Sequence, residues 1–319
     1  MDKELFPQKI SRYNNSAAIK QRASELKWSV PYAMLCLADD ERVNFVRDKI
    51  GDWYMNFSTF LDKKLVDEIK KDFDQRIWEI YCTKLFDVKF GLIKKREDGL
   101  PDFKTEISGK DTWIEVTAPK NGTEEDGNKL PLISDVIKGG LIVFGGLVNE
   151  RTDPIALRIK TAIERKIDNY RKKYLKNGVR EKDPLIIAIN SALFDDGINQ
   201  EQIALQLFFN MGNTLVTFNK DPKIETIGVF REQRDVANSM KGDCVKVGLF
   251  QSDAFKEISC VILTHNNIYN LELNSDGIGS DLLVIFNRYA VNKIDPSCFE
   301  FCKRMIPDGD DVRRETPKH

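Results

Sequence analysis

Two carboxylates, Asp102 and Glu115, lie in a segment whose pattern predicts a β-hairpin. The turn formers Ser108-Gly-Lys-Asp111 stand between them, and Gly at the first central position of a two-residue turn favours a type II′ hairpin. Residues paired across two strands point to the same face, and that face repeats every second residue. The expected pairs on the face of the acids are Lys104 with Glu115 and Asp102 with Thr117. Two carboxylates one diagonal step apart offer oxygen ligands to a hard cation such as Mg²⁺, and a backbone carbonyl between them could add another.

A third acid, Glu79, stands where most of its neighbours are apolar, in Arg76-Ile-Trp-Glu-Ile-Tyr-Cys82. Charged side chains are almost never buried without a partner. Near the hairpin, Glu79 could bind a metal directly or through water. The alternative interpretation is an ion pair with Arg76 or a neighbouring base. In the same way, Glu115 could instead form a cross-strand salt bridge with Lys104.

The order of a helix carrying Glu79, then Pro101-Asp102, then Ile-Glu115-Val-Thr117 resembles the PD-(D/E)XK, or restriction-endonuclease-like, nuclease superfamily. The resemblance covers about 79–190 of the chain. It implies hydrolysis of phosphodiester bonds, usually in DNA, with Mg²⁺ or Mn²⁺ as the cofactor. It also implies that Asp102 is the central metal ligand, Glu115 the second ligand, and Glu79 the helix-borne acid that completes the shell.

The sequence departs from this family at Thr117, where the motif has a lysine. A lysine there would orient or deprotonate the attacking water and offset charge in the transition state, which threonine cannot do. We take Lys166 as the first choice of substitute, since the resemblance allows the lysine on the following helix and Lys166 borders that helix's apolar stripe. Lys120 and Lys104 are the alternatives. A catalytically degenerate nuclease fold that binds nucleic acid or a partner protein without cleavage is the competing hypothesis.

Hydrophobic periodicity predicts helices within 1–90, at 154–177 and at about 199–211, and strand pattern appears at 100–120 and 184–190. Further short strands are expected at Cys244–Phe250, Ser259–Thr264, Tyr269–Leu273 and Leu282–Phe286. This order predicts an α/β (α+β) fold with a central mixed β-sheet flanked by helices, a restriction-endonuclease-like core with a helical N-terminal part. We expect a single nuclease-like domain over 1–306, made of a helical extension (1–70), a catalytic core (71–190) and a strand-rich part (191–306). Residues 307–319 are expected to form a disordered tail.

The charge of the chain is balanced overall but polarised locally. Lys and Arg total 49 against 50 Asp and Glu, so a general basic coat is excluded. However, residues 155–182 contain ten Lys and Arg against three Asp and Glu, a net charge of +7. The candidate nucleic-acid contacts are Lys94, Lys95, Arg96, Arg158 and Arg165. Positive walls beside a carboxylate–metal centre suit a phosphate backbone, and DNA is therefore the expected partner.

The rarity of histidine narrows the chemistry further. The chain has two, His265 and His319, which excludes metal sites built on clustered imidazoles. His265 is interpreted as a structural or surface residue, not as a general base. The six cysteines are too dispersed for a disulfide scaffold, and no stretch approaches the length of a membrane span, so a cytoplasmic location is expected. A homodimer would suit a nuclease that cuts both strands.

Overall fold

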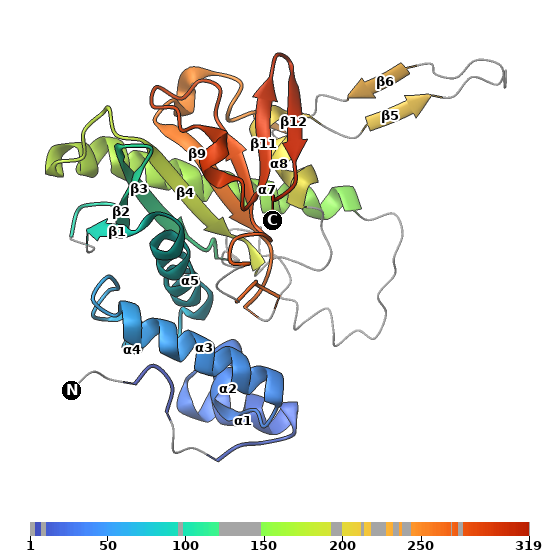
Figure 1. The fold of residues 1–319 in the computed structure, drawn as a ribbon. Coiled ribbons are helices and arrows are strands. Elements are labelled where there is room, and N and C mark those ends of the chain that lie inside the picture. The colour runs from blue at the N-terminus through green and yellow to red at the C-terminus, as the bar shows by residue number, and fades with distance from the viewer. Residues whose placement is uncertain are drawn as a thin grey trace.

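The computed structural model describes the chain except for residues 1–3, 8–10, 95–97, 121–147, 193–199, 212–213, 218–227, 232–235, 238–243, 269, 274–276 and 319. Its central feature is a mixed eight-stranded sheet in the order β1-β2-β3-β4-β9-β10-β11-β12 (Figure 1). The strands are β1 (Leu92–Lys94), β2 (Phe103–Ile107), β3 (Lys110–Thr117), β4 (Leu185–Asn190), β9 (Ile258–Thr264), β10 (Leu283–Phe286), β11 (Lys303–Asp308) and β12 (Asp311–Glu315). Four further strands form two separate pairs, β5 (Thr214–Thr217) with β6 (Gly228–Arg231) and β7 (Val236–Ala237) with β8 (Cys244–Val245). The predicted α/β class with a mixed sheet is confirmed.

The described α-helices are α1 (Ser16–Leu26), α2 (Val30–Leu37), α3 (Glu41–Phe57), α4 (Leu65–Glu68), α5 (Phe73–Phe90), α7 (Val148–Asn169) and α8 (Gln200–Phe209). Helices α1 to α4 lie together away from the sheet, and α5 leads from them to it (Figure 1). The helix predicted at 154–177 begins earlier and ends as a π-helical turn (Tyr170–Tyr174) and a 3-10 turn (Leu175–Asn177). None of the helices in the described part of the chain is long and apolar enough to cross a membrane.

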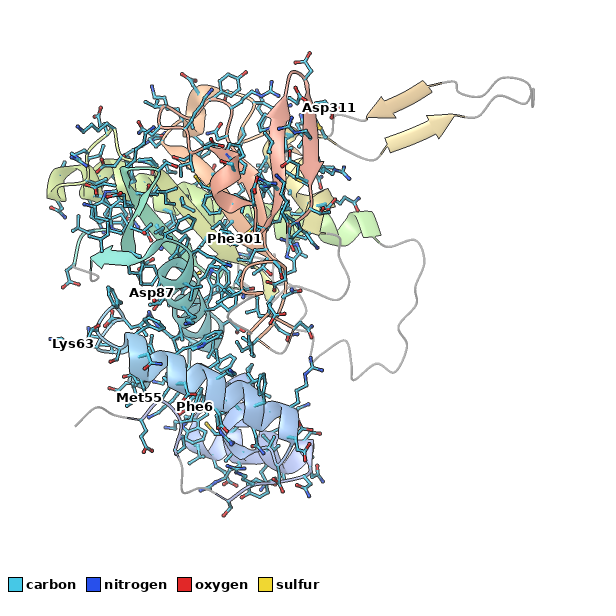
Figure 2. All side chains as sticks on the ribbon, viewed as in Figure 1. Phe6, Met55, Lys63, Asp87, Phe301 and Asp311 are labelled. Atoms are coloured by element: carbon cyan, nitrogen blue, oxygen red, sulfur yellow. The ribbon has the colours of Figure 1, made fainter. Side chains whose placement is uncertain are left out.

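The sheet separates two apolar cores, because alternate residues of its strands face opposite sides. Ile114 and Val116 of β3 pack with α5 and the N-terminal helices, together with an aromatic cluster of Phe90, Phe299 and Phe301. Figure 2 labels Phe301 of this cluster. Trp113 and the odd-numbered residues of β4 pack with α7 and α8. The central strands β4 and β9 are buried along their whole length, which explains their nearly continuous apolar sequences. Helices α5 and α7 therefore cover opposite faces of the same strands.

The hairpin forms, but its turn differs from the predicted type II′ turn. Ser108 and Gly109 occupy the two central positions with φ of 51° and 73°, which is the pattern of a type I′ turn. Ile107 therefore pairs with Lys110, and Lys104 lies opposite Trp113 instead of Glu115. Type I′ turns match the right-handed twist of the flanking strands, and glycine tolerates the second positive φ. Since the register moves by an even number of residues, each side chain stays on its predicted face.

The C-terminal tail is a correction to the sequence prediction. Residues 307–319 were expected to be disordered, yet β12 pairs antiparallel with β11 from Asp308–Asp311 to Arg304–Glu315. Pro307 is tolerated there because β10 pairs with β11 only as far as Met305, so its missing N–H is not needed on that side. The strand expected at Tyr269–Leu273 is also wrong within its described residues, and the one at Cys244–Phe250 reduces to Cys244–Val245.

His265 follows β9 and is buried against Ser191, which follows the neighbouring strand β4. The Ser191 hydroxyl donates to the carbonyl of Thr264 at 3.1 Å, so the contact with His265 assigns a proton to its Nδ1. Nε2 is buried and has no hydrogen-bond partner in the described part of the chain. Burial lowers the pKa of His265 to about 4, from an ordinary value of 6.5. The native protein therefore keeps this imidazole neutral.

Acid should destabilise the protein through this group. Below about pH 6.5 the unfolded chain is protonated at His265, whereas the native protein is protonated there only below about pH 4. The free energy of unfolding therefore falls as the pH is lowered between these two values. At about pH 5 this costs about 2 kcal/mol of unfolding free energy relative to neutral pH. His265→Asn keeps a donor near the Nδ1 position and does not titrate. Urea unfolding should show the wild type losing about 2 kcal/mol more than the variant between neutral pH and about pH 5. A difference that does not change with pH would contradict this assignment.

Candidate active site

The candidate site lies at the end of β3, where its pairing with β2 has stopped. This strand pairs with β2 only as far as Phe103–Ile114, but it pairs with β4 through Thr117. Among the described strands, the last three residues of β3 therefore have a neighbour on one side only. They are buried, and buried backbone groups must find partners. Side chains provide them at this open edge.

Asp102, directly before β2, provides the first of these partners. Its Oδ2 accepts a hydrogen bond from the backbone N–H of Val116 at 2.8 Å. Asp102 is buried, as expected for a carboxylate that replaces a missing strand partner. The hydrogen bond holds the carboxylate beside Glu115, which precedes Val116 in the strand.

Gln75, in the first turn of α5, provides the others. Its Oε1 accepts from the N–H of Ala118 at 2.7 Å, and its Nε2 donates to the carbonyl of Val116 at 3.4 Å. The same Nε2 donates to Oε1 of Glu79 at 2.9 Å. Only one orientation of the amide satisfies all three contacts. Gln75 thus joins α5 to the open edge of β3.

Lys166 of α7 brings the two hairpin acids together. Its Nζ donates to Oε2 of Glu115 at 2.7 Å and lies 3.9 Å from Oδ2 of Asp102. All three side chains are buried or nearly so, with exposed fractions of 2% for Glu115, 7% for Asp102 and 15% for Lys166. The structure therefore places Asp102, Glu115 and Lys166 in one cluster, as the sequence predicts.

The cluster carries one positive charge for two acids. Burial, and then the nearby charge of Asp102, raise the pKa of Glu115 to about 8, against the opposing effect of Lys166. Burial alone would lower the pKa of Lys166, but the charges of Glu115 and Asp102 raise it above its ordinary value, so the ammonium group stays protonated. Glu115 Oε1 is buried without a hydrogen-bond partner in the described residues. A bound cation would stabilise the ionised form of Glu115 and would contact this unsatisfied oxygen.

Glu79 is buried as predicted, but it does not complete a three-acid metal shell. Arg76 Nη1 donates to both carboxylate oxygens of Glu79 at 2.8 Å, and Arg76 also forms an ion pair with Glu68. The ion pair with Arg76, the alternative interpretation of the sequence, is therefore the observed one. Across the described residues, no group of three or more His, Cys, Asp or Glu side chains could hold a metal ion.

The two alternative lysines have other partners. Lys104 forms an ion pair with Asp111 at 2.8 Å and lies over the ring of Trp113, so the alternative interpretation, a salt bridge with Glu115, is wrong. The shifted register explains this, because Lys104 now stands opposite Trp113. Lys120 is 72% exposed and pairs with Asp72 at 3.0 Å. Only Lys166, of the three predicted lysines, contacts the acids.

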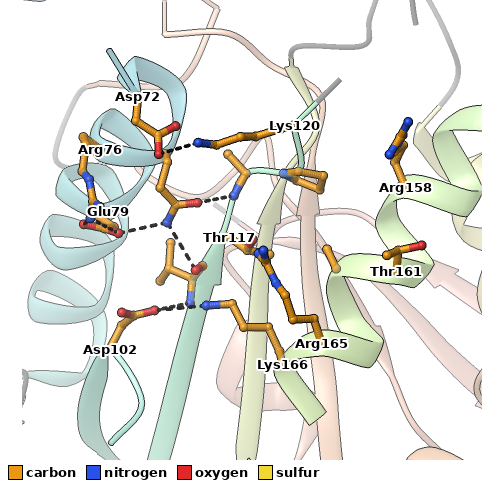
Figure 3. A pocket seen from close by; sticks show the side chains of 15 residues that line it. Asp72, Arg76, Glu79, Asp102, Thr117, Lys120, Arg158, Thr161, Arg165 and Lys166 are labelled. Carbon is orange, nitrogen blue, oxygen red and sulfur yellow. Dashed lines mark hydrogen bonds and ion pairs between the residues drawn. The ribbon is translucent and has the colours of Figure 1, made fainter. Parts of the chain in front are cut away.

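A pocket of about 410 Å³ opens above the cluster, between α5 and α7 (Figure 3). Asp102, Val116, Thr117 and Lys166 form part of its wall, with Gln75, Arg76 and Glu79 on the side of α5 and Arg158, Thr161 and Arg165 on the side of α7. Glu115 is buried and is not among the residues that line the pocket. The predicted contacts Arg158 and Arg165 thus face the same pocket as Asp102. Lys95 and Arg96 lie outside the described residues, and only the backbone of Lys94 is described.

The donor set suits a hard cation with incomplete protein ligation. Asp102 and Glu115 provide carboxylates, and the Val116 carbonyl, which accepts a hydrogen bond from Gln75, belongs to the residue whose N–H donates to Asp102. Mg²⁺ is usually bound by one or two carboxylates and keeps several waters, so a third acid is not required. The unsatisfied Oε1 of Glu115 fits such an ion. These residues fit Mg²⁺ or Mn²⁺ without Glu79.

No family model, curated protein or solved structure matches the chain. The candidate site is therefore identified by its own geometry. The sequence interpretation did not include Gln75, although it precedes Glu79 by one helical turn and is polar on a largely buried helix. That spacing was the available indication of its role.

Lys166→Met should destabilise the protein, because it leaves the buried Asp102–Glu115 pair without its counter-charge. We expect a loss of about 3 kcal/mol in the free energy of unfolding, measured with urea near neutral pH. Lys172→Met is the matched control, since the Lys172–Asp168 pair near the same helix end is 72% and 60% exposed. Its loss should stay below about 0.5 kcal/mol.

Adding Glu115→Gln to Lys166→Met should restore part of the lost stability, because glutamine removes the cost of burying or protonating an acid that the first change leaves without a counter-charge. A double variant less stable than Lys166→Met alone would mean that lost packing, and not charge, explains the effect.

Proposed function

We propose that this chain is a metal-dependent endonuclease that hydrolyses DNA phosphodiester bonds at the pocket between α5 and α7. The observation that carries the proposal is the position of Lys166, whose Nζ lies within 2.7 Å of Glu115 and 3.9 Å of Asp102. A lysine beside two hairpin carboxylates is the arrangement that the PD-(D/E)XK resemblance implies, although this lysine comes from α7.

The order of elements supports a restriction-endonuclease-like core. Helix α5 precedes the β2–β3 hairpin, α7 follows it, and β4 returns parallel to β3. The core proposed here therefore spans α5 to β4, in agreement with the range of the resemblance. The helices before it and the strands after it have no role in the proposal. A setting in restriction or another defence against foreign DNA, and a cytoplasmic location, rest on analogy and composition alone.

In the proposed reaction, the two acids and Lys166 have different roles. Bound Mg²⁺ or Mn²⁺ would polarise a phosphoryl oxygen and supply a nucleophilic water near neutral pH. Asp102 and Glu115 would hold the cation. The Lys166 ammonium, which is charged and held by both acids, can orient a water through its remaining N–H groups and offset charge developing on phosphate oxygens. Since its pKa is raised, Lys166 acts better as a donor than as a base.

The basic side of the pocket suits the DNA backbone. Arg165 is exposed and Arg158 is half-buried, and both are on the pocket wall formed by α7. A guanidinium group can bind two phosphate oxygens at once, which fixes the position of the DNA backbone without recognising the base sequence. A phosphodiester between these arginines and Asp102 would lie over the acid–lysine cluster.

A degenerate fold that binds without cleaving is the second candidate. Thr117, at the position of the family lysine, is 1% exposed and cannot supply a charge. In addition, Lys166 is already bonded to Glu115. Cleavage assays separate the two candidates.

Incubation with plasmid DNA and Mg²⁺ or Mn²⁺ tests the activity. We expect the wild type to cut, and Asp102→Ala, Glu115→Ala and Lys166→Ala each to lose at least about a hundredfold in rate, because the first two remove cation ligands and the third removes the positive charge beside the reacting phosphate. Asp111→Asn is the matched control. It alters a carboxylate of the same hairpin that pairs with Lys104 and Arg180 outside the pocket, and it should cut at the wild-type rate.

Equal cutting by all preparations would point to a contaminating nuclease and remove the proposal's support. Metal-independent DNA binding with no cutting by any preparation would favour the degenerate fold. Full activity in Lys166→Ala alone would exclude this lysine as the catalytic group while leaving the two acids in place.

Arg165→Gln should weaken DNA binding in a salt-dependent manner. Removing one phosphate contact lowers the slope of log K against log salt concentration by about one, with similar losses for unrelated DNA sequences. Lys173→Gln, an exposed base beyond the end of α7 that is not part of the pocket wall, should leave the slope unchanged. Fluorescence anisotropy with a labelled duplex measures both. Identical slopes for the two variants would mean that α7 does not bind the phosphate backbone at the pocket.

A further inference from the structure

Gln75 makes more contacts with the candidate site than helix packing requires. Its single amide group bonds to the Glu79 carboxylate, the Val116 carbonyl and the Ala118 N–H. A side chain that only held α5 to the sheet would need the backbone contacts but not the bond to a carboxylate. Gln75 is also part of the pocket wall.

The attachment of α5 to the sheet does not depend on Gln75. One turn further along the helix, Trp78 Nε1 donates to the carbonyl of Ala188 in β4 at 3.1 Å, and Trp78 is fully buried. Ile77 and Ile80 are buried in the core beneath α5 as well. The helix therefore has its own apolar and polar contacts with the sheet away from the pocket.

The position of the Val116 carbonyl, by contrast, depends on few groups. Beyond Ile114 no β2 residue pairs with β3, so the carbonyl has no strand partner at this edge in the described structure. Asp102 holds the N–H of Val116 at 2.8 Å, and Gln75 holds the carbonyl and the following N–H of Ala118. A carbonyl oxygen has two lone pairs, so one can bond to Gln75 while the other binds a cation.

We infer that Gln75 is a positioning residue for the metal: it holds the Val116 carbonyl as the third oxygen ligand beside Asp102 and Glu115. The inference rests on the proposed function, because it presumes that these acids bind a divalent cation. Partners that orient metal ligands in this way typically change metal affinity by about ten- to a hundredfold. The same amide also bonds to Glu79, which forms its ion pair with Arg76 on the α5 wall of the pocket.

Direct binding of Mn²⁺, followed by electron paramagnetic resonance, tests this without reference to activity. We expect Gln75→Met, which removes all three hydrogen bonds at nearly constant volume, to weaken Mn²⁺ binding by about tenfold or more. Gln75→Ala, which leaves room for water to hydrate the freed backbone groups, is the second variant if the first folds poorly. Trp78→Phe is the matched control. It removes one hydrogen bond between α5 and the sheet, should lower the melting temperature, and should leave Mn²⁺ affinity unchanged.

Cleavage provides a second measurement. In Gln75→Met the Mg²⁺ concentration for half-maximal rate should rise by a similar factor, with a smaller change in the rate at saturating Mg²⁺. Wild-type Mn²⁺ affinity in a folded Gln75→Met or Gln75→Ala protein would overturn the role of Gln75 and leave the proposed function standing. If the wild type bound no more Mn²⁺ than Asp102→Ala with Glu115→Ala, the metal site would fall, and this inference with it.

Discussion

The separation of β2 from β3 after Ile114 is the constraint on which the candidate site depends. It leaves the last residues of β3 buried but without a strand on one side, and buried peptide groups must be hydrogen-bonded. Asp102 and Gln75 satisfy them through their side chains. The Asp102 carboxylate is thereby fixed beside Glu115. If β2 continued to pair with β3 past Ile114, the β2 backbone would occupy this position instead. The interruption of regular structure creates the place for polar chemistry inside an otherwise apolar sheet.

The two helices reach this edge from opposite faces, and they differ in charge. The α5 side carries Glu79 already neutralised by Arg76, whereas α7 directs Lys166 toward the acids and Arg158 and Arg165 toward the pocket. A phosphate group entering between the helices would therefore meet positive charge on the α7 side and a pair of acids beneath it. A divalent cation would suit this distribution of charge, because the cation would offset the repulsion between the carboxylates and the phosphate.

The sequence could predict which side chains share a face of the hairpin or helix, but not which partner each side chain contacts. Asp102 and Glu115 stay on one face even though the turn is type I′, because an even shift in register preserves the alternation. Lys166 was predictable because the family resemblance allows a lysine on this helix and position 166 borders its apolar stripe. The partner of Glu79 was not, since spacing permits both a metal and Arg76 and only packing selects between them. Residues 307–319 contain proline and many charges, which the edge of a sheet tolerates, and their pairing with β11 depends on strands far away in sequence.

The absence of a lysine at position 117 is weaker support for a degenerate site than the motif alone suggests. What catalysis needs is a charge at a point in space, and a side chain from another element can supply it. Thr117 follows Glu115 on the same face, so a lysine there would approach the acids from β3 itself. Lys166 approaches them from α7 and comes within 3.9 Å of both. A small residue at 117 leaves that approach unobstructed, because a second long side chain would compete for the same buried space. Thr117 and Lys166 are therefore compatible: the small side chain leaves the space through which Lys166 reaches the acids. The positions of Asp102, Glu115 and Lys166 are a better guide to catalytic activity than the residue type at position 117.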